Sequence, residues 1–530
     1  MEKKKAQIWL PMAFALIMLA GMFLGYQLRG NLPWSGNAMR MGSKATLEQV
    51  MDLIRNRYVD EVNTDSLNDA AIDAMLGQLD PHSVYIPPRQ LQGVNEDLAG
   101  RFEGIGVEFN IFDDTVHVLN VLKDGPSDKA GLLVGDRIVA VGDSIVAGNG
   151  ITGDRIRSLL RGPGASVVNV TIVRGNDKKT VPITRGYIPL HALDAAYIMA
   201  PGTGYIRLNK FAETTYREFM EALEALQKQG MKSLVLDLRD NGGGILDEAV
   251  EMADEFLDGD KLIVYTEGKH TPRKEYKSKR RGLFETGKLI VLIDEGSASA
   301  TEVLTGALQD WGRATVIGRR SFGKGLVQEQ YDLRDGAGLR LTVARYYTPL
   351  GRSIQKPYDK GFEEYDEEII SRYHKGQMTH ADSVPSNNGK KYTTADGKTV
   401  YGGGGITPDI FVPLDTSSYD STLSSLYRKN TLSNFIYRYY TAHQATFSAY
   451  KDPASFSKTY QPGDEMVRDL VEFAKKDSIT MTMPEGHSKE NLENRLKTLM
   501  ARQIWRTEGY FEVVNERDPV LKKALETLAK

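Results

Sequence analysis

The stretch LVLDLRDNGGG, residues 234–244, joins an apolar run to three consecutive glycines. Residues 234–238 are apolar except for Asp237, which is the pattern of a strand buried inside a sheet. The glycines then let the backbone turn sharply before a helical pattern that reaches residue 257. A strand, a glycine-rich turn and a helix in this order are typical of a layered α/β domain.

The same alternation continues on both sides of this stretch, from residue 204 to residue 345. It predicts strands over residues 205–208, 234–238 and 289–293, helices over residues 215–229 and 300–310, and a strand in LVQEQYDL, residues 326–333. A short apolar run at residues 410–412 is expected to return to this core as a further strand. The sequence therefore predicts an α/β core at the centre of a multidomain chain.

Changes in composition divide the rest of the chain. Residues 45–78 have the apolar spacing of helices, residues 100–186 are short β-rich runs separated by glycine, and residues from about 415 onward are mostly helical in pattern. Residues 356–404 are polar and repeatedly charged, and we expect a mobile insertion there. The predicted organisation is an N-terminal segment 1–29, a linker 30–44, a helical region 45–95, a β-module 96–186, the α/β core 187–414 and a helical C-terminal domain 415–530.

The N-terminus has the pattern of a membrane segment. Lys3, Lys4 and Lys5 precede an uncharged run of 23 residues, 6–28, and about 20 apolar residues are enough to cross a bilayer. The lysines favour a cytoplasmic N-terminus, which places everything after Arg29 in a periplasm-like space. We therefore expect a single-pass anchor in a bacterial inner membrane, with a cleaved signal peptide as the alternative.

Charge and cysteine content exclude several classes of protein. The 530 residues include 67 lysines and arginines and 70 aspartates and glutamates, a net charge of −3, which lacks the basic excess typical of nucleic-acid-binding proteins. The chain has no cysteine, so disulfides, thiolate nucleophiles and cysteine-bound metals are excluded. We expect no nucleic-acid partner, no metal and no other cofactor.

The segment IDEGSASATE, residues 293–302, offers a candidate nucleophile. It runs from an apolar strand through Gly296 into a helical pattern, so Ser299 stands at a strand-to-helix turn beside free backbone N–H groups. Ser299 and Glu302 also match a capping box, in which the serine only caps the helix, and this segment alone favours that interpretation. None of the eight histidines lies within 25 residues of Ser299, so a serine–histidine–aspartate triad has no support.

A glycine-flanked lysine follows 25 residues later, in GRRSFGKG, residues 318–325. The motif nearly matches a nucleotide-binding Walker A loop, but Gly325 replaces the hydroxyl that holds Mg²⁺, and a strand pattern follows instead of a helix. A lysine kept from water has a lowered pKa and can act as a base. Lys324 is therefore the candidate base for Ser299, against the alternative of an ordinary solvated lysine.

The β-module carries a candidate site of its own, GIGV at Gly104, Ile105, Gly106 and Val107. Two glycines at the start of a strand let neighbouring N–H groups point the same way and hold a carboxylate, although such a sequence alone is more often only a turn. The later run AGLLVGDRIVAVG, residues 130–142, changes that balance. Together the two motifs resemble a PDZ domain, which binds extended C-terminal tails by strand addition.

Longer motifs extend the resemblance. They occur in order as DLRDNGGG (237–244), GSASATE (296–302), GALQD (306–310), FGKGLVQ (322–328) and LTVARYYTPLGRSIQ (341–355), with LDPHSVY (79–85) and GITPDI (405–410). In this order they resemble a carboxy-terminal processing protease, also called a tail-specific protease, over about residues 45–413. The resemblance implies a crotonase- or Clp-protease-like β/α core with an inserted PDZ domain at residues 96–186.

The resemblance also implies roles residue by residue. Ser299 matches the nucleophile, Lys324 the general base and Gln328 the residue that orients the lysine. The backbone N–H groups of Ala300 and Gly243 match the oxyanion hole. Many members have Asn-Pro-Gly-Gly where this chain has Asn-Gly-Gly-Gly, so the loop here has a freer backbone. The implied activity is that of a serine endopeptidase that needs no metal or other cofactor.

The implied substrates are polypeptides with apolar C-terminal tails, bound at residues 104–107 and cleaved through an acyl-enzyme at Ser299. Two other classes of function remain open: a tethered binding scaffold on an inactive protease fold, and an acyl-CoA enzyme on a crotonase-like core. The aromatic-rich C-terminal helices are expected either to form a homodimer or to cap the core, and the dimer is the preferred alternative.

Overall fold

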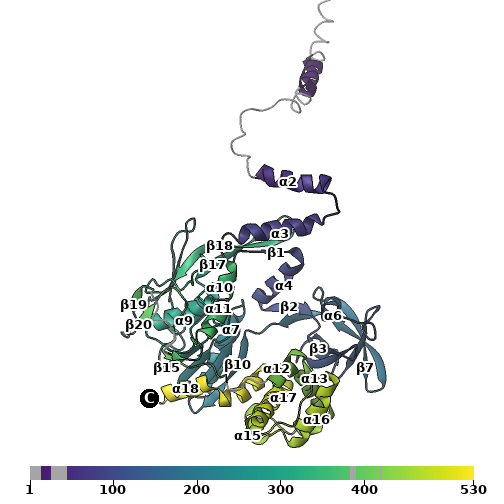
Figure 1. The fold of residues 1–530 in the computed structure, drawn as a ribbon, viewed down its shortest axis with the longest axis vertical. Coiled ribbons are helices and arrows are strands. Elements are labelled where there is room, and N and C mark those ends of the chain that lie inside the picture. Colours follow the sequence, from purple (N-terminus) through teal and green to yellow (C-terminus); the bar gives the residue numbers. More distant parts are fainter. Residues whose placement is uncertain (1–13, 25–43, 382–388, 417–420) are drawn as a thin grey trace, which may run out of the picture. The chain divides into compact units, whose positions relative to one another are not determined.

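The computed structural model describes residues 14–24, 44–381, 389–416 and 421–530, and it divides into two compact units (Figure 1). The first unit, residues 1–75, contains a helix over residues 14–24, then α2 (Lys44–Arg57) and most of α3 (Thr64–Leu76). The second unit, residues 76–530, contains all the strands that the structure describes. The predicted catalytic and tail-binding residues therefore all belong to the second unit.

The membrane helix predicted for residues 6–28 is not found. Of that run the structure describes only residues 14–24, which are helical. Among the described residues, no helix combines the length and the hydropathy that a membrane span requires. The two ends of the run, and the linker predicted before residue 44, lie outside the described residues.

A six-stranded sheet forms the centre of the second unit. Its strand order is β10–β11–β12–β15–β16–β21, and all neighbours are parallel except β10 and β11. The strands are β10 (Leu193–Ala200), β11 (Thr203–Leu208), β12 (Ser233–Asp237), β15 (Lys288–Ile293), β16 (Thr315–Gly318) and β21 (Ile410–Phe411). The helices between them include α7 (Thr215–Lys228), α8 (Leu246–Asp254) and α9 (Ala300–Asp310). The predicted strand–helix alternation is confirmed.

Apolar side chains cover both faces of this sheet. On one face α7, α8 and α9 bury a large core that includes Phe219 and Leu304. On the other face Val235 and its neighbours pack against Leu521 of the C-terminal helix. A strand that is buried on both faces needs apolar side chains on both of them, which explains why residues 234–238 are apolar except for Asp237.

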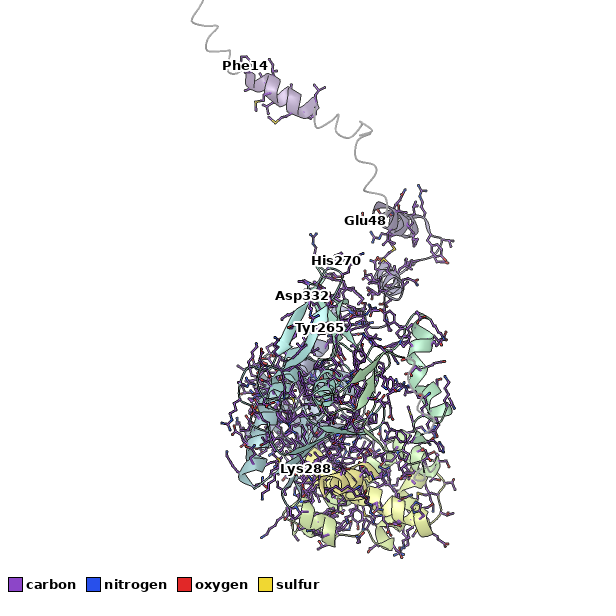
Figure 2. The ribbon with its side chains drawn as sticks, turned by 90° about the vertical axis from the view of Figure 1, so that its left-hand side faces the viewer. Phe14, Glu48, Tyr265, His270, Lys288 and Asp332 are labelled. Carbon is purple, nitrogen blue, oxygen red and sulfur yellow. The ribbon has the colours of Figure 1, made fainter. Side chains whose placement is uncertain are left out.

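A second sheet has the strand order β1–β18–β13–β14, with β17 paired to β18. Its strands are β1 (Val84–Ile86), β13 (Leu262–Glu267), β14 (Lys274–Lys277), β17 (Leu326–Asp332) and β18 (Gly338–Tyr347). Because β17 begins two residues after Lys324, the strand predicted in place of a phosphate-binding helix is confirmed. Figure 2 labels Tyr265 on β13, His270 in the loop after it and Asp332 at the end of β17.

Residues 101–189 form the β-module, which has its own core of residues such as Val118, Ile138 and Ile172. The strands are β2 (Arg101–Gly104), β3 (Val107–Phe112), β4 (Thr115–Val121), β5 (Arg137–Val141), β6 (Ser144–Ile145), β7 (Val167–Arg174), β8 (Asp177–Thr184) and β9 (Gly186–Pro189). The helices are α4 (Pro88–Ala99) before the module, and α5 (Pro126–Lys129) and α6 (Gly153–Leu160) within it. In the main sheet, β3–β4–β5–β7–β8, β3 is an edge strand, which suits the addition of a peptide strand.

The predicted mobile insertion, residues 356–404, contains regular structure in its described parts. α10 (Phe362–Asp366) and α11 (Glu368–His374) are followed by a hairpin of β19 (Lys391–Thr393) and β20 (Thr399–Tyr401), and residues 382–388 lie outside the description. Tyr365, Arg372 and Val400 are buried. The insertion therefore packs on the α/β core through specific side chains.

The C-terminal region is helical, as predicted. Its helices are α12 (Ser421–Arg428), α13 (Thr431–Ala442), α14 (Gln444–Phe447), α15 (Pro453–Thr459), α16 (Asp464–Lys476), α17 (Gly486–Val514), the short η2 (Asn515–Arg517) and α18 (Pro519–Leu528). α12–α17 share a core that includes Phe435 and Leu496. α18 packs on the central sheet, where Lys288 Nζ donates to Leu528 O at 2.7 Å, and Figure 2 shows Lys288 beside this yellow helix. The chain's own C-terminal helix thus caps the core, one of the two roles expected for this region.

Candidate active site

Ser299 lies at the elbow between β15 and α9. It immediately precedes the first helical residue, Ala300, and its backbone adopts φ +56° and ψ −116°. A positive φ is costly for a residue with a side chain, so the surrounding structure must hold this turn. The elbow presents the serine to a pocket, as the sequence predicted.

The buried carboxylate of Glu302 holds the elbow and the lysine loop together. It accepts hydrogen bonds from the Ser299 N–H (2.9 Å), the Ser321 hydroxyl (2.5 Å) and the N–H groups of Gly323 (2.7 Å) and Lys324 (2.8 Å). Burial raises the pKa of Glu302 to about 7, against the lowering effect of these bonds. The capping-box interpretation is therefore right in part, because Glu302 accepts from Ser299, but the same carboxylate also fixes the backbone at Lys324.

Gln328 orients the side chain of Lys324. Lys324 Nζ donates to Gln328 Oε1 at 3.0 Å, and Gln328 Nε2 donates to the backbone carbonyl of His82. Because the second bond uses the amide NH₂ group, it turns the amide oxygen toward the lysine. The structure thus brings Lys324 and Gln328 together in the arrangement that the resemblance implied.

The surroundings of Lys324 lower the pKa of its side chain. Burial lowers the pKa of its ammonium group and the charge of Arg340 lowers it further, whereas Asp80 and Glu302 raise it. The pKa of His82 is lowered to about 4, chiefly by burial and then by the charge of Lys324, against the raising effect of Asp80. A neutral amine has a lone pair with which it can accept a proton, and an ammonium does not.

Tyr346 links the nucleophile to the base on a second side. Its hydroxyl donates to Ser299 O at 3.1 Å and to Lys324 O. Burial raises its pKa well above the usual value, so the hydroxyl keeps its proton and remains a donor. The elbow and the lysine loop are therefore joined both by Glu302, through N–H groups, and by Tyr346, through carbonyls.

The glycine loop lies directly against the nucleophile. Gly243 has φ +90°, and a Cβ there would lie 2.6 Å from Ala298 O and 2.8 Å from Ser299 Cβ, so no larger residue fits. The Gly243 N–H, predicted as an oxyanion donor, instead donates to Asn241 Oδ1 at 2.9 Å. The Ala300 N–H belongs to the first turn of α9, where a helix leaves N–H groups without intrahelical acceptors.

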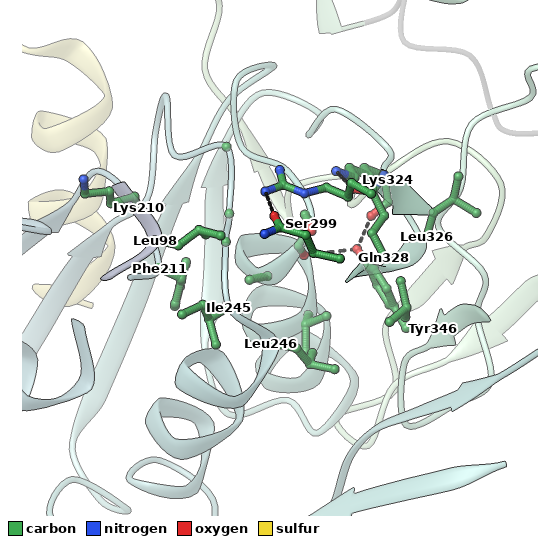
Figure 3. A pocket seen from close by; sticks show the side chains of 18 of the residues that line it. Leu98, Lys210, Phe211, Ile245, Leu246, Ser299, Lys324, Leu326, Gln328 and Tyr346 are labelled. Atoms are coloured by element: carbon green, nitrogen blue, oxygen red, sulfur yellow. Dashed lines mark hydrogen bonds between the residues drawn. The ribbon is translucent and has the colours of Figure 1, made fainter. Parts of the chain in front are cut away.

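A cavity of about 460 Å³ opens beside Ser299. Its lining includes the five residues to which the resemblance gave catalytic roles: Gly243, Ser299, Ala300, Lys324 and Gln328. In Figure 3, Lys324 and Gln328 lie on one side of Ser299, and Leu98, Phe211 and Ile245 lie on the other. The lining therefore combines the polar candidate residues with apolar side chains such as Phe211 and Leu246, which suit a polypeptide chain.

The described residues that line this pocket do not include a histidine. His270, the histidine nearest Ser299 in sequence, is exposed in the loop after β13. Within the described ranges, no group of three or more histidine, aspartate or glutamate side chains is arranged to hold a metal ion.

The candidate tail-binding residues lie in the β-module, outside the pocket lining. Gly104 ends β2, Val107 begins β3, and Gly106 between them has φ +74°. Ile105 is buried, and its carbonyl accepts from the Ser127 N–H at 3.0 Å, which anchors the loop. The four residues thus form a tight turn at one end of an edge strand, a position from which N–H groups can hold a terminal carboxylate.

Sequence reasoning did not assign site roles to Glu302, Tyr346 or His82. Glu302 was interpreted only as part of a helix cap, and no role in the site was given to Tyr346 or His82 within their motifs. The available signal was a glutamate inside the apolar helix ATEVLTGAL, residues 300–308, because a buried carboxylate needs hydrogen-bond donors. Such a residue ties separate segments together.

Comparison with known proteins agrees with this geometry. The profile of peptidase family S41 matches residues 202–363, and a PDZ domain profile matches residues 117–174. The N-terminal domain of the activating protease CtpB matches residues 34–88, and a family of unknown function matches residues 422–506. A probable CtpA-like serine protease of Staphylococcus haemolyticus is 33% identical over 453 residues, which is 85% of this chain and 84% of that protein. The chain belongs to the C-terminal processing proteases of peptidase family S41.

Two further relatives of this S41 protease cover less of it or are more distant. A probable CtpA-like serine protease of Staphylococcus aureus (strain MRSA252) is 37% identical over 310 residues, 58% of this chain and 62% of that protein. A solved structure, the photosystem II D1 C-terminal processing protease, has 28% identity and a TM-score of 0.36 and covers 70% of this chain and 87% of its own. The predicted family is confirmed: the S41 protease is a serine protease, and its β-module contains a PDZ domain.

Proposed function

We propose that this S41 protease is an endopeptidase that cleaves polypeptides selected by their C-terminal tails, using a Ser299–Lys324 dyad and an acyl-enzyme. The observation that carries the proposal is the hydrogen bond from Lys324 Nζ to Gln328 Oε1, made by a partly buried lysine in the pocket that also contains Ser299. A lysine held in this way and kept from water can take the proton of a serine hydroxyl.

The proposed reaction has two halves. Ser299 Oγ attacks the scissile carbonyl carbon while neutral Lys324 Nζ accepts its proton, and Gln328 Oε1 stabilises the ammonium that forms. The ammonium protonates the leaving amine, and the C-terminal fragment departs from the acyl-enzyme. A water molecule that loses its proton to Lys324 then hydrolyses the ester and frees the serine.

The oxyanion of each tetrahedral intermediate is stabilised by the N–H groups of Ala300 and Gly243 in this proposal. The positive end of the α9 dipole acts in the same direction. The N–H of Gly243 first has to leave Asn241 Oδ1, so substrate binding includes a small rearrangement of the glycine loop.

Substrate selection is assigned to the PDZ domain. A tail adds to the free edge of β3, and its terminal carboxylate binds at residues 104–107. Phe112, at the end of β3, stacks on Tyr437 of α13 with ring centroids 5.3 Å apart, so the C-terminal domain contacts this strand. The proposed substrates are exported proteins with apolar tails.

The proposed location is the periplasmic side of a bacterial inner membrane, and its support is the apolar run after the three N-terminal lysines. Separation of cells into membrane and soluble fractions, with protease added to spheroplasts, tests it. Recovery of the intact chain in the cytoplasmic fraction contradicts it. A homodimer is the proposed assembly, and light scattering of the purified chain that gives the 58.9 kDa mass of one chain contradicts that.

The catalytic test uses the purified chain, a protein substrate with an apolar C-terminal tail, and the same substrate with an amidated C-terminus. We expect wild type to cleave the free tail and Ser299→Ala and Lys324→Ala to lose about 10⁴-fold or more in kcat. A fluorophosphonate is expected to label wild type but not Ser299→Ala.

Three outcomes contradict the proposal. Full activity of Ser299→Ala removes the serine from the mechanism. Tail binding by wild type without any turnover favours the scaffold alternative. Tight binding of coenzyme A in calorimetry, without proteolysis, favours the acyl-CoA alternative.

A further inference from the structure

Two short helices of the insertion reach the loop that carries Lys324. α10 and α11 lie almost entirely beyond the segment that matches family S41. Arg372 of α11 is 3% exposed, and its guanidinium donates to three successive backbone carbonyls, those of Arg320 (3.3 Å), Ser321 (2.7 Å) and Phe322 (3.1 Å). A guanidinium with this much burial is oriented by its bonds, so the contact is a fixed part of the fold.

The Lys324 loop, residues 320–325, is consequently held by two opposite charges. Arg372 donates to carbonyls in its first half, and the Glu302 carboxylate accepts from the N–H groups of Gly323 and Lys324 in its second half. Glu368 accepts from Arg372 Nε at 2.6 Å and so fixes the plane of the guanidinium. The backbone on both sides of Phe322, and that of Lys324 itself, is thereby restrained.

A second set of contacts leads from α10 to Gln328. The Tyr365 hydroxyl lies 2.7 Å from His82 Nε2, and the backbone carbonyl of His82 is the acceptor that orients the Gln328 amide. Lys356 is buried with its Nζ 4.1 Å from the ring centroids of both Phe322 and Tyr365, which joins the two helices to the loop.

We infer that α10 and α11 position the general base: Arg372 holds the Lys324 loop away from water, and Tyr365, through His82, keeps Gln328 aligned with the amine. Arg372 and Tyr365 are positioning residues, since they act through the loop and through His82. The inference rests on the proposed Ser299–Lys324 dyad and adds a role for an insertion that the family profile leaves unmatched.

The pH dependence of activity reports this role. The charged and titratable groups that face Lys324 are Arg340 on β18, Asp80 and His82 before β1, and Glu302 on α9. A change at Arg372 leaves all four in place. If the loop relaxes toward solvent, the lysine becomes better hydrated and its pKa rises. As the pH falls, the variant therefore loses activity earlier than wild type, and the acidic limb of its profile is shifted to higher pH.

The test compares Arg372→Lys with Arg313→Lys in the full chain. Arg313 is a matched control because its guanidinium also donates to three backbone carbonyls, those of Phe256, Phe284 and Gly287, but none of the three lies in the Lys324 loop. Each variant is measured for Tm, and for kcat and KM across pH with a small activated ester that does not need the PDZ domain.

We expect both variants to lower Tm, but only Arg372→Lys to lower kcat by about 10- to 100-fold, with little change in KM. The acidic limb of its kcat/KM profile is also expected to lie at higher pH than that of wild type. Tyr365→Phe, which removes only a hydroxyl, is expected to shift the profile in the same direction by a smaller amount. If Arg372→Lys does not fold, the profile of Tyr365→Phe decides the test.

An unshifted profile in Arg372→Lys, or equal kcat losses in the two arginine variants, overturns the inference. An unshifted profile in Tyr365→Phe overturns it when Arg372→Lys gives no folded protein. These results differ from a failure of the proposed function, in which wild type itself does not hydrolyse the ester or Ser299→Ala does so normally.

Discussion

The two sides of the catalytic pocket are restrained in different ways. The Lys324 loop receives buried bonds from Glu302 on α9 and from Arg372 on α11, both distant in sequence. In the glycine loop the N–H of Gly243 is bonded to Asn241 of the same loop, and its neighbours Gly242 and Gly244 are exposed. Distant segments hold the glycine loop too, since the Phe211 N–H donates to Gly243 O at 2.9 Å, so the two sides differ in the Gly243 N–H, which is turned toward Asn241. In the proposed mechanism the base is therefore in place before substrate binds, whereas the oxyanion site is completed during binding.

The largest expected loss of kcat among these variants comes from removing the carboxylate of Glu302, which holds the Lys324 loop. Glu302→Ala leaves the N–H groups of Ser299, Gly323 and Lys324 without their acceptor, so we expect kcat to fall by about 10³-fold together with a loss of Tm. The matched control is Glu255→Ala, which removes another buried carboxylate that accepts from the Leu283 N–H and the Tyr216 hydroxyl away from the pocket. Equal kcat losses in the two variants contradict a special role for Glu302.

The glycine loop gives the next largest effect. At Gly243 a methyl group meets Ala298 O at 2.6 Å and the backbone has φ +90°, so Gly243→Ala is expected to reduce kcat by about 10²-fold. Gly242→Ala is the control, because a Cβ there meets nothing within 4 Å. Steady-state kinetics of the two variants decide the point: similar activity of both means that the loop does not contribute to oxyanion stabilisation.

A pH profile sharpens the comparison further. The charge of Arg340 lowers the pKa of Lys324, so Arg340→Gln raises that pKa and leaves less neutral amine at any given pH below it. We expect kcat/KM on the acidic side of the profile to fall by about three- to ten-fold and to recover at alkaline pH. Arg345→Gln, an exposed charge on the same strand, is expected to leave the profile unchanged.

The smallest expected effect concerns the hydroxyl of Tyr346. Tyr346→Phe removes the donor shared by Ser299 O and Lys324 O but leaves the Glu302 bonds in place. We therefore expect only a two- to five-fold loss of kcat, roughly that of one neutral hydrogen bond. A loss as large as that of Glu302→Ala would mean that the carbonyl side, and not the carboxylate, holds the elbow and the lysine loop together.

Much of the central sheet was predictable because its strands are buried on both faces and appear as uninterrupted apolar runs. The helix predicted over residues 300–310 is α9 with the same bounds, and the strand predicted over 234–238 is β12 shifted by one residue. α8 ends at Asp254 rather than residue 257, because the chain leaves the helix in a turn in which the Phe256 N–H bonds Ala253 O. Ser299, Lys324 and Gln328 share one pocket, as the family motifs implied.

What could not be predicted depends on contacts between distant segments. Arg372 lies about 50 residues from the carbonyls that it contacts, and Gln328 lies 246 residues from the carbonyl of His82. Residues 356–404 are polar in composition, which is typical of a mobile loop, but inside the structure Glu368 pairs with both Lys356 and Arg372. The amino-acid composition shows that these residues are polar but not which of them form ion pairs, so this part of the site could not be predicted from the sequence.

The C-terminal helix has a consequence for the order in which the protein is made. The strands of the central sheet are complete at residue 411, but Leu521, which covers one of its faces, follows about 110 residues later, or roughly 5 to 20 s of synthesis. Asp518, at the start of the same helix, bonds Arg239 just before the glycine loop at 2.7 Å. The last part of the core to be synthesised therefore also holds the segment that leads into the glycine loop.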